Sequence, residues 1–207
     1  DVDGDSLSVT GLTANGGTLT PNEAGTAWTF EPAANFNGQV TLSYDVTDGT
    51  ANVAQSATVT VNAVNDAPVA GASPSFSMNE DGTLQITAAQ LLAGASDVDG
   101  DDLSVANLMA SGGTLTPNEA GTAWTFEPAA DFNGTVTLSY DVSDGTANVA
   151  QTAAVTVNAV NDAPVAGASP SFSMNEDGGF IEITKAQLLA NSSDVDGDSL
   201  SVANLAA

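Results

Sequence analysis

The sequence repeats itself with a period of about 96 residues, and this repeat limits the chain to a series of similar domains. The segment Asp1–Val9 returns almost unchanged as Asp97–Val105 and again as Asp194–Val202. Residues 1–66 and 97–162 are identical at 56 of 66 aligned positions. Solenoid repeats are shorter, about 20–50 residues, whereas about 100 residues is the size of a whole domain. The pattern therefore predicts domains in tandem.

The repeat boundaries predict three segments within the 207 residues. Residues 1–65 form the C-terminal two-thirds of a first repeat, 66–161 a complete repeat, and 162–207 the N-terminal part of a third. We therefore expect the chain to be part of a longer array. The boundary is placed at Pro68, because proline interrupts strand pairing and holds Ala67 extended. The junction has no Gly or Ser tract, so it is not a flexible tether.

Alternating apolar and polar residues predict β-strands, beginning with Val40–Val46 and Ala57–Ala63. Thr87–Leu92 predicts a short helical turn capped by Thr87, and Pro117–Gly121 predicts a turn between two strands. Further short strands are expected at Ser75–Met78, Leu84–Thr87, Leu103–Leu108, Gly113–Thr116, Ala123–Glu127 and Thr135–Val142. Short strands with frequent turns indicate an all-β chain of tandem Greek-key β-sandwich domains.

Charge excludes several classes of function. The chain has a single basic residue, Lys185, against 26 acidic residues, for a net charge of −25, and it has no His or Cys. Nucleic-acid binding needs cations that neutralise phosphate, and Ser-His-Asp catalysis, Cys-His catalysis, the usual zinc sites and disulfides all need residues that are absent here. A hydrophobic content of 42% still predicts a buried core. Trp28 and Trp124, each inside an alternating strand, are expected to belong to it.

The repeated motif D-x-D-G-D is the part of the sequence that most clearly indicates a chemical function. In Asp97-Val98-Asp99-Gly100-Asp101, three carboxylates share one tight turn. Two carboxylates about 4 Å apart repel by about 4 kcal/mol at an effective dielectric constant of 20. With almost no basic side chains available, a hard divalent cation with oxygen ligands is the fitting counter-charge, and this predicts Ca²⁺. The motif is not an EF-hand, because its glycine is fourth rather than sixth. A solvated acidic turn is the alternative.

Chain length places the acidic residues at the ends of the domains. From Asp66 to Glu80 the chain is largely extended and covers about 40 Å, the length of one sandwich. The next strand and helical turn bring it back, so Asp97 and Asp99 are expected near Asp66. Asp144, after the strand Thr135–Val142, is expected at that same end. We therefore predict calcium between successive domains, where it removes the repulsion and stiffens the joint.

The strings S-M-N-E-D-G, D-V-D-G-D, Y-D-V-S-D-G and V-N-D-A-P resemble, in that order, the calcium motifs of cadherin repeats. More closely, the chain resembles the cadherin-like tandem extender repeats of large bacterial surface adhesins of the RTX/Bap type. The resemblance implies cadherin/Ig-like sandwiches in a linear rod, a stalk rigidified by calcium that projects a distal binding region. It also implies type I secretion, an extracellular position at the bacterial cell surface, and a part in attachment and biofilm.

Carried over by motif, the resemblance implies two sets of calcium ligands and part of a third. Junction one would use Asn65, Asp66, Asp97, Asp99 and Asp144. Junction two would use Glu80, Asn161, Asp162, Asp194 and Asp196. The first repeat would contribute Asp1, Asp3 and Asp48. A further family glutamate has no clear match, and Glu127 or Asp131 could stand in for it. The linker has Ala63 and Ala67 where cadherin linkers carry Asp and Asn, so one to three ions are expected per junction.

Other functions remain as alternatives. A calcium-dependent carbohydrate- or protein-binding β-sandwich module would need an exposed ligand loop, such as Asn15–Gly17 or Asn133–Gly134. Loops usually vary between binding modules, whereas here they are as constant as the strands, which favours a spacer. Near-identical copies and undifferentiated carboxylates argue against an enzyme. The expected partners are neighbouring repeats of the same chain, joined through Ca²⁺, with no nucleic acid and no membrane insertion by this segment.

Overall fold

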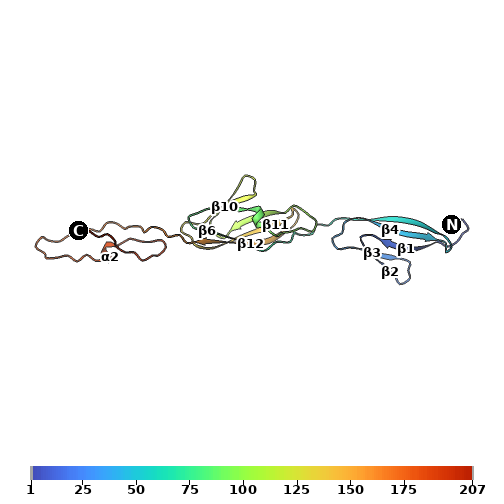
Figure 1. The fold of residues 1–207 in the computed structure, drawn as a ribbon, viewed down its shortest axis with the longest axis horizontal. Coiled ribbons are helices and arrows are strands. Elements are labelled where there is room, and N and C mark those ends of the chain that lie inside the picture. The colour runs from blue at the N-terminus through green and yellow to red at the C-terminus, as the bar shows by residue number, and fades with distance from the viewer. Residues whose placement is uncertain (1, 207) are drawn as a thin grey trace. The chain divides into compact units, whose positions relative to one another are not determined.

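The computed structural model describes residues 2–206, which form two units built mainly of β-strands (Figure 1). Unit 1 contains the residues up to Pro68 together with Ser96–Asp102. Unit 2 contains Val69–Ala95 and the residues from Leu103 onward.

Unit 2 holds the complete set of seven strands, in two sheets. One sheet has four strands in the order β6-β12-β11-β8, and the other has three in the order β7-β10-β9. The pairs are antiparallel except for β6 and β12, which run parallel. The strands are β6 (Ser75–Asn79), β7 (Leu84–Thr87), β8 (Ser104–Ala110), β9 (Thr114–Pro117), β10 (Ala123–Glu127), β11 (Gly134–Ser143) and β12 (Asn148–Asn158). This arrangement confirms the expected all-β sandwich.

The core of unit 2 lies between its two sheets. Every second residue of β11 from Val136 to Val142 is buried, because successive side chains of a strand point to opposite faces. From the other sheet, Phe126 and Ile86 are fully buried, and Trp124 packs partly buried against the same cluster. The tryptophan therefore lies in the core region, as its place in an alternating strand predicted.

A short helix, α1 (Ala88–Leu91), follows β7 and helps to close this core. Thr87 caps it in a reciprocal capping box with Gln90, which supplies partners for the first backbone amides. The buried hydroxyl of Tyr140 donates a hydrogen bond to the carbonyl oxygen of Leu91 at 2.8 Å. Burial raises the pKa of Tyr140. The helix and the central strand β11 are thus connected by both packing and a hydrogen bond.

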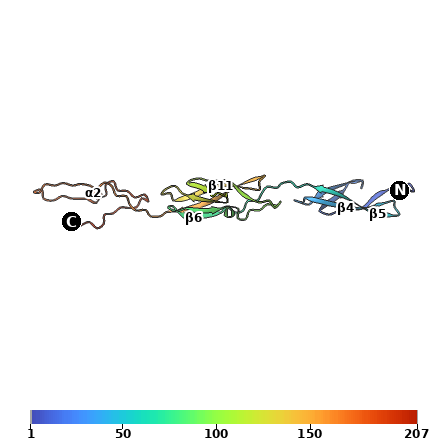
Figure 2. The same ribbon diagram turned by 90° about the horizontal axis from the view of Figure 1, so that it is seen from above.

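Unit 1 contains the matching strands β1 (Ser8–Ala14), β2 (Gly17–Pro21), β3 (Trp28–Pro32), β4 (Gly38–Thr47) and β5 (Asn52–Val61). They form a three-stranded sheet in the order β1-β4-β5 and a β2-β3 hairpin. β4 and β5 pair antiparallel from Gly38↔Val61 to Thr47↔Asn52, and Figure 2 labels both in this unit. Among the described residues of this unit, Val40 is the one hydrophobic side chain that is buried.

The pairing of β8 with β11 is interrupted by a bulge at Asn107, where the register shifts between Ser139 and Asp141. Asn107 has a left-handed backbone, with φ of 53°, which Asn and Gly tolerate better than other residues. Gly11 has φ of 63° and Asn204 has φ of 55° at the same position of the neighbouring copies. The left-handed residue therefore recurs in all three copies, and the pairing of β1 with β4 shows the matching bulge between Thr10 and Thr13.

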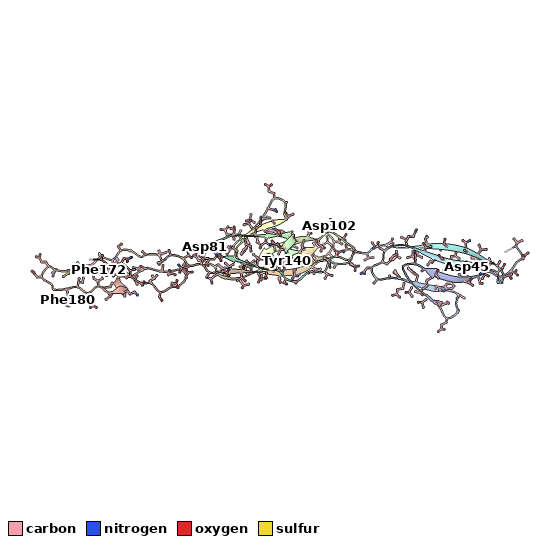
Figure 3. All side chains as sticks on the ribbon, viewed as in Figure 1. Asp45, Asp81, Asp102, Tyr140, Phe172 and Phe180 are labelled. Atoms are coloured by element: carbon pink, nitrogen blue, oxygen red, sulfur yellow. The ribbon has the colours of Figure 1, made fainter. Side chains whose placement is uncertain are left out.

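The residues after β12 form no strand between 163 and 206, and their one β-bridge joins Val165 to Ser193. A short helix, α2 (Lys185–Leu188), is capped by Thr184 as α1 is by Thr87. Phe172 and Phe180, labelled in Figure 3, are both exposed. This segment repeats the sequence of 66–102 without its partner strands.

Candidate metal centres

The D-x-D-G-D turn is held together by its first aspartate. One carboxylate oxygen of Asp97, Oδ1, accepts hydrogen bonds from the backbone amides of Asp99 at 2.8 Å and Asp101 at 3.4 Å. Gly100 follows with φ of 82°, a conformation that glycine adopts without a steric penalty. The turn places carboxylate oxygens of Asp97, Asp99 and Asp101 within 4.8 Å of one another. Oδ2 of Asp97 is buried and has no hydrogen-bond partner.

In unit 1 the linker lies against this turn. The backbone amide of Asp66 donates to Oδ2 of Asp99 at 2.7 Å, and the side-chain amide of Asn65 donates to the carbonyl oxygen of Asp66 at 2.9 Å. Four of the five residues predicted for junction one, Asn65, Asp66, Asp97 and Asp99, thus lie in one connected network. The fifth, Asp144, belongs to unit 2.

Unit 2 contains a second, more buried centre around Glu80, which follows β6. The side chain is only 4% exposed, and its Oε1 accepts a hydrogen bond from the backbone amide of Val160 at 2.6 Å. The other oxygen, Oε2, is buried without a partner. Carboxylate oxygens of Glu80, Asp162 and Asp196 lie within 4.8 Å of one another. The linker meets the acidic turn here as well, since the amide of Asp162 donates to Oδ2 of Asp196 at 2.7 Å.

This second centre gathers negative charge without a basic side chain among its ligand groups. Burial raises the pKa of Asp162, and the nearby carboxylates of Asp81, Asp131, Asp196 and Glu80 raise it further. Oδ2 of Asp162 is buried and lacks a hydrogen-bond partner. Buried carboxylates are normally paired or bound to a metal, because an uncompensated charge is costly to bury. Oxygen-only ligands of this kind fit a hard cation such as Ca²⁺.

A third group of carboxylates shares Asp162 with Asp81 and Asp131. Asp131 occupies the turn before β11 with φ of 57°, and the corresponding residue in unit 1, Asn35, has the same φ. Asp81 was not among the residues predicted from sequence. The sequence feature that could have identified Asp81 is its position directly after Glu80 in the repeated string N-E-D-G.

The remaining predicted residues support the loops around these centres. Asn161 donates to the carbonyl oxygen of Asp162 at 2.8 Å, and Oδ1 of Asp194 accepts from the amide of Asp196 at 3.1 Å, which orients that carboxylate. Asp3 is exposed, and Asp1 lies outside the described residues.

Asp48 and Asp144 occupy equivalent turns, each after a long strand. Oδ1 of Asp144 accepts from the amides of Thr146 and Ala147, both at 2.6 Å, and Asp48 makes the matching bonds to Thr50 and Ala51. The amides of Ala51 and Thr50 lower the pKa of Asp48. Neither aspartate belongs to one of the three carboxylate groups found in the described part of the chain.

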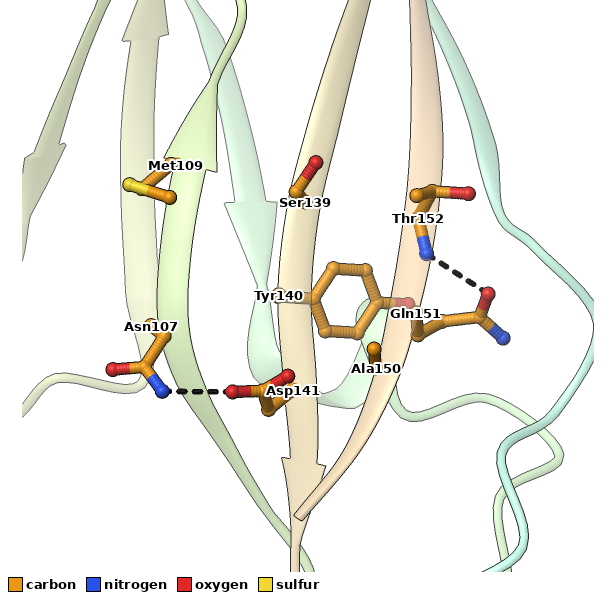
Figure 4. Close-up of a pocket in the computed structure, with 8 residues that line it drawn as sticks. All are labelled: Asn107, Met109, Ser139, Tyr140, Asp141, Ala150, Gln151 and Thr152. Atoms are coloured by element: carbon orange, nitrogen blue, oxygen red, sulfur yellow. Dashed lines mark hydrogen bonds between the residues drawn. The ribbon is translucent and has the colours of Figure 1, made fainter.

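A pocket of about 380 Å³ lies on the four-stranded sheet of unit 2 and was not predicted from sequence (Figure 4). The side-chain amide of Asn107 donates to Asp141 at 2.7 Å across it. The lining residues are Asn107, Met109, Ser139, Tyr140, Asp141, Ala150, Gln151 and Thr152. The pocket is lined by mostly neutral side chains, so it differs in chemistry from the acidic centres.

A family model described as the cadherin-like domain matches residues 1–62, 64–158 and 160–207. The chain belongs to the cadherin-like domain family. Cadherin-like domains are adhesion-type extracellular modules that typically bind Ca²⁺, and the three acidic groups of this cadherin-like chain agree with that property. No match was found among curated protein sequences. None of the helices in the described part is long and apolar enough to cross a membrane.

Solved structures resemble the cadherin-like fold at low sequence identity. Human protocadherin-24, in a structure of its first two extracellular domains, is 16% identical, with a TM-score of 0.50 over 76% of this chain and 84% of that one. Protocadherin gamma B7 is 13% identical, with a TM-score of 0.40 over 81% of this chain and 45% of that one. An endo-fucoidan hydrolase of glycoside hydrolase family 107 is 20% identical, with a TM-score of 0.31, and 76% of this chain aligns with 24% of it. The chain thus spans about a quarter of that hydrolase. The likeness to protocadherin-24 concerns the fold alone.

Proposed function

We propose that this chain is a calcium-rigidified extender region of a large bacterial surface adhesin, which projects a distal binding region for attachment and biofilm formation. The observation that carries the proposal is the buried Oε2 of Glu80, which has no hydrogen-bond partner and lies with the carboxylates of Asp162 and Asp196. A fold that keeps such a carboxylate in place needs a positive charge there. Calcium supplies that charge when bound.

The residues proposed to hold calcium come from the linker, the acidic turn and the loop after β6. Glu80, Asp162 and Asp196 would serve one junction. Asp66, Asp97 and Asp99 would serve the other, joined by Asp144 and the carbonyl oxygen of Asn65. Because each set includes linker residues, binding would connect one repeat to the next and restrict motion at the joint. The partners in this proposal are the neighbouring repeats themselves.

The constancy of the loops supports a mechanical role over ligand recognition or catalysis. Gly16–Ala34 returns letter for letter as Gly112–Ala130, although this segment includes a turn as well as strands. Recognition and catalysis usually depend on loops that differ between copies. A region that only sets distance and stiffness has no need of such variation, so we propose a non-enzymatic spacer.

Calcium is expected to stabilise the folded chain by mass action. A ligand that binds only the folded state adds RT ln(1 + [L]/Kd), which is about 2.7 kcal/mol when its concentration is 100 times Kd. Extracellular modules bind calcium with Kd values of about 10⁻⁴–10⁻³ M, so about 1 mM calcium would occupy roughly half to nine-tenths of such sites and add about 0.4–1.4 kcal/mol per site. The stiffened chain is also expected to resist proteolysis better.

Thermal melting and small-angle X-ray scattering of the 207-residue chain, with calcium and with EDTA, test the proposal. Calcium should raise Tm and increase the maximum dimension. Asp99→Asn should reduce the gain in dimension and leave the strands of both units folded by circular dichroism. Asp102→Asn is the matched control, because Ser6 occupies that position in the first copy. Identical melting and scattering in both buffers would overturn the proposal.

A further inference from the structure

The bulge in β8 coincides with the pocket on the outer face of the four-stranded sheet of unit 2. At the bulge, Asn107 and Leu108 of β8 stand opposite the single residue Tyr140 of β11. A bulge bends its strand and redirects the side chains beside it. The pocket of about 380 Å³ lies at this point, on β8, β11 and β12 (Figure 4). The bulge therefore accounts for a hollow in an otherwise regular sheet.

One wall of the pocket is a carboxylate bonded to an amide. Nδ2 of Asn107 donates to Oδ2 of Asp141 at 2.7 Å, and Figure 4 shows the two side chains pointing toward each other from neighbouring strands. This bond orients the carboxylate. An ionised carboxylate accepts several hydrogen bonds, and the amide still offers a second N–H and a carbonyl oxygen. The pair can therefore donate to and accept from a ligand at the same place.

The other walls combine hydroxyl groups with apolar surface. Ser139 and Thr152 are both exposed beside the pair. Met109 is 65% exposed, so a ligand that covered its side chain would remove apolar area from water. Gln151 is fixed by a hydrogen bond from its Nε2 to the segment before β6. A few oriented polar groups beside apolar surface are the usual composition of a small-molecule site.

The two copies of the repeat differ mainly on this face. Ten positions differ between residues 1–66 and 97–162. Five of the ten lie on the outward side of β8, β11 and β12, namely Asn107, Met109, Thr135, Thr152 and Ala154. Three of these five line the pocket. Residues 118–122 are exposed too, yet they are identical to 22–26, so exposure alone does not explain where the copies differ.

Unit 1 carries a different set of side chains at the place of the pocket. The residues that replace Asn107, Met109 and Thr152 there are Gly11, Thr13 and Ser56. Because Gly11 has no side chain, the carboxylate of Asp45, the counterpart of Asp141, cannot receive the same amide bond. The amide–carboxylate pair thus belongs to unit 2 alone of the two units, and a spacer that only sets distance does not require it.

The chemistry of the lining selects the class of ligand. An anion is repelled by Asp141 and by the net charge of −25. An apolar ligand would cover the polar groups and leave them without partners, which is costly. A cation finds more carboxylates at the acidic centres, where three lie within 4.8 Å of one another. A neutral polyhydroxylated ligand remains, because its hydroxyls both donate and accept and its C–H face can cover Met109.

From the pocket, its oriented amide–carboxylate pair and the differences between the copies, we propose that unit 2 binds a neutral saccharide on the outer face of β8, β11 and β12. Sugar hydroxyls donate to Asp141 and accept from Asn107, while the apolar side of the ring packs on Met109. A volume of about 380 Å³ is near the lower end of the range of about 300–1,000 Å³ for small-molecule sites, so the site takes a short part of a glycan. The proposal goes beyond the calcium-dependent spacer and does not depend on it.

An array of neutral oligosaccharides built from glucose, galactose, mannose and N-acetylglucosamine, probed with the labelled 207-residue chain, tests the proposal. The chain should be retained on at least one neutral glycan and not on the sulfated or sialylated forms of the same glycans, which its charge repels. The glycan that binds best is then titrated into the chain by isothermal calorimetry. Retention on none of the neutral glycans, or on charged ones alone, would overturn the proposal.

Variants of the pocket connect binding to its residues. Asp141→Asn should raise the Kd for that glycan at least about tenfold, because hydrogen bonds to a charged acceptor are roughly twice as strong as neutral ones. Asn107→Gly and Met109→Thr should also weaken binding and should fold, since unit 1 has these residues at the same positions. Thr135→Gln is the matched control, because it places Gln39 of the first copy on the same face outside the pocket. Equal affinities of the control and Asp141→Asn, with both folded by circular dichroism, would contradict the proposal.

Amide chemical shifts of the nitrogen-15-labelled chain locate the site independently of any variant. Addition of the glycan should shift the amides around Asn107, Ser139 and Thr152. Shifts that are confined to the turn at Asn133–Gly134 or to the acidic centres would place the ligand elsewhere and overturn the proposal.

Salt and calcium separate this site from the acidic centres. Because the ligand is neutral, its affinity should stay the same when NaCl is raised from about 0.01 M to about 1 M. It should also be equal in calcium and in EDTA. A strong loss of affinity in salt, or in EDTA with the strands still folded by circular dichroism, would overturn the proposal. Glycan binding that persists in a chain whose melting ignores calcium would overturn the proposed calcium function and support the saccharide site.

Discussion

At the scale of single residues, the two carboxylate oxygens of Glu80 differ in their surroundings. Oε1 is used by the amide of Val160, which fixes the side chain, and Oε2 is left without a protein partner. A carboxylate held in this way is positioned before any ion arrives, so less ordering is needed on binding.

Glu80→Gln should separate these two roles. The amide oxygen of glutamine can still accept from Val160, so the fold is retained, but the charge is lost. Calcium affinity should fall about tenfold or more, which corresponds to about 1.4 kcal/mol, because a neutral amide replaces the charged oxygen that a hard cation prefers. In EDTA the variant should melt no lower than the parent, since it has one fewer unpaired buried charge. Isothermal titration calorimetry and thermal melting measure the two effects.

Glu119→Gln is the control for that variant, because Glu119 is exposed in the turn between β9 and β10. It removes the same charge from the chain and should leave calcium binding unchanged. Equal losses in the two variants would mean that overall charge, and not the centre at Glu80, governs affinity.

The pH dependence of the calcium-free chain should differ in sign between two aspartates. The pKa of Asp162 is raised above its ordinary value of 3.8 by burial and neighbouring carboxylates, so the folded state holds this proton more tightly than the unfolded state. Its contribution favours folding at low pH and is lost as pH rises through the raised pKa. The pKa of Asp48 is lowered by the amides of Ala51 and Thr50, so its contribution is present above 3.8 and is lost as pH falls through the lowered pKa.

Carbon-13 NMR titration of the carboxyl groups in EDTA measures these two pKa values directly. The midpoint for Asp162 should lie above 3.8 and that for Asp48 below it. The reverse order would contradict the electrostatics described for the centre around Glu80.

At the scale of elements, the bulge in β8 depends on a residue that tolerates a positive φ. Asn107→Ala should destabilise unit 2 by about 1–2 kcal/mol, the cost of a left-handed conformation for a residue with a Cβ and no compensating side chain. Asn107→Gly should cost less, because Gly11 occupies the same bulge in unit 1. Urea unfolding monitored by tryptophan fluorescence measures both. Equal losses would show that the hydrogen bond to Asp141, which both variants lack, matters more than the backbone.

The strand pattern could be predicted from sequence where a strand alternates clearly. Leu84–Thr87 and Ala123–Glu127 have the predicted bounds. The prediction of Ala57–Ala63 was wrong at both ends, because β5 begins at Asn52 and ends at Val61. The early residues of β5 pair with the end of β4, although their exposed side chains show no inward-facing pattern. Backbone pairing, which leaves no trace in side-chain alternation, decides these bounds.

For the acidic centres, motif and spacing were enough to bring the linker and the acidic turn together. The amide of Asp66 bonded to Asp99 and the grouping of Glu80 with Asp162 and Asp196 follow the predicted ends of the strands. Asp131 was named from sequence as one of two stand-ins for a family glutamate, whereas Asp81 was not named. The grouping of both with Asp162 depends on the direction of two turns, which side-chain alternation does not predict. The metal itself stays a prediction.

At the scale of the whole molecule, self-repulsion should make stability sensitive to salt. With a net charge of −25, the folded calcium-free chain should become more stable when salt screens its self-repulsion. The Debye length, over which charges interact, falls from about 30 Å at 0.01 M salt to about 3 Å at 1 M. In EDTA, Tm should rise between these two NaCl concentrations. In saturating calcium the rise should be smaller, because bound cations already reduce the charge. Differential scanning calorimetry measures both, and a salt response that calcium leaves unchanged would contradict the idea that it neutralises these clusters.

The parallel pairing of β6 with β12 has a mechanical consequence. The chain enters the complete repeat just before β6 and leaves it just after β12, and in parallel strands these two points lie at opposite ends of the pair. Tension along the polypeptide would therefore slide one strand past the other, loading all the backbone bonds of the pair together instead of opening them one by one. A repeat that is pulled at these two points should unfold only at high force.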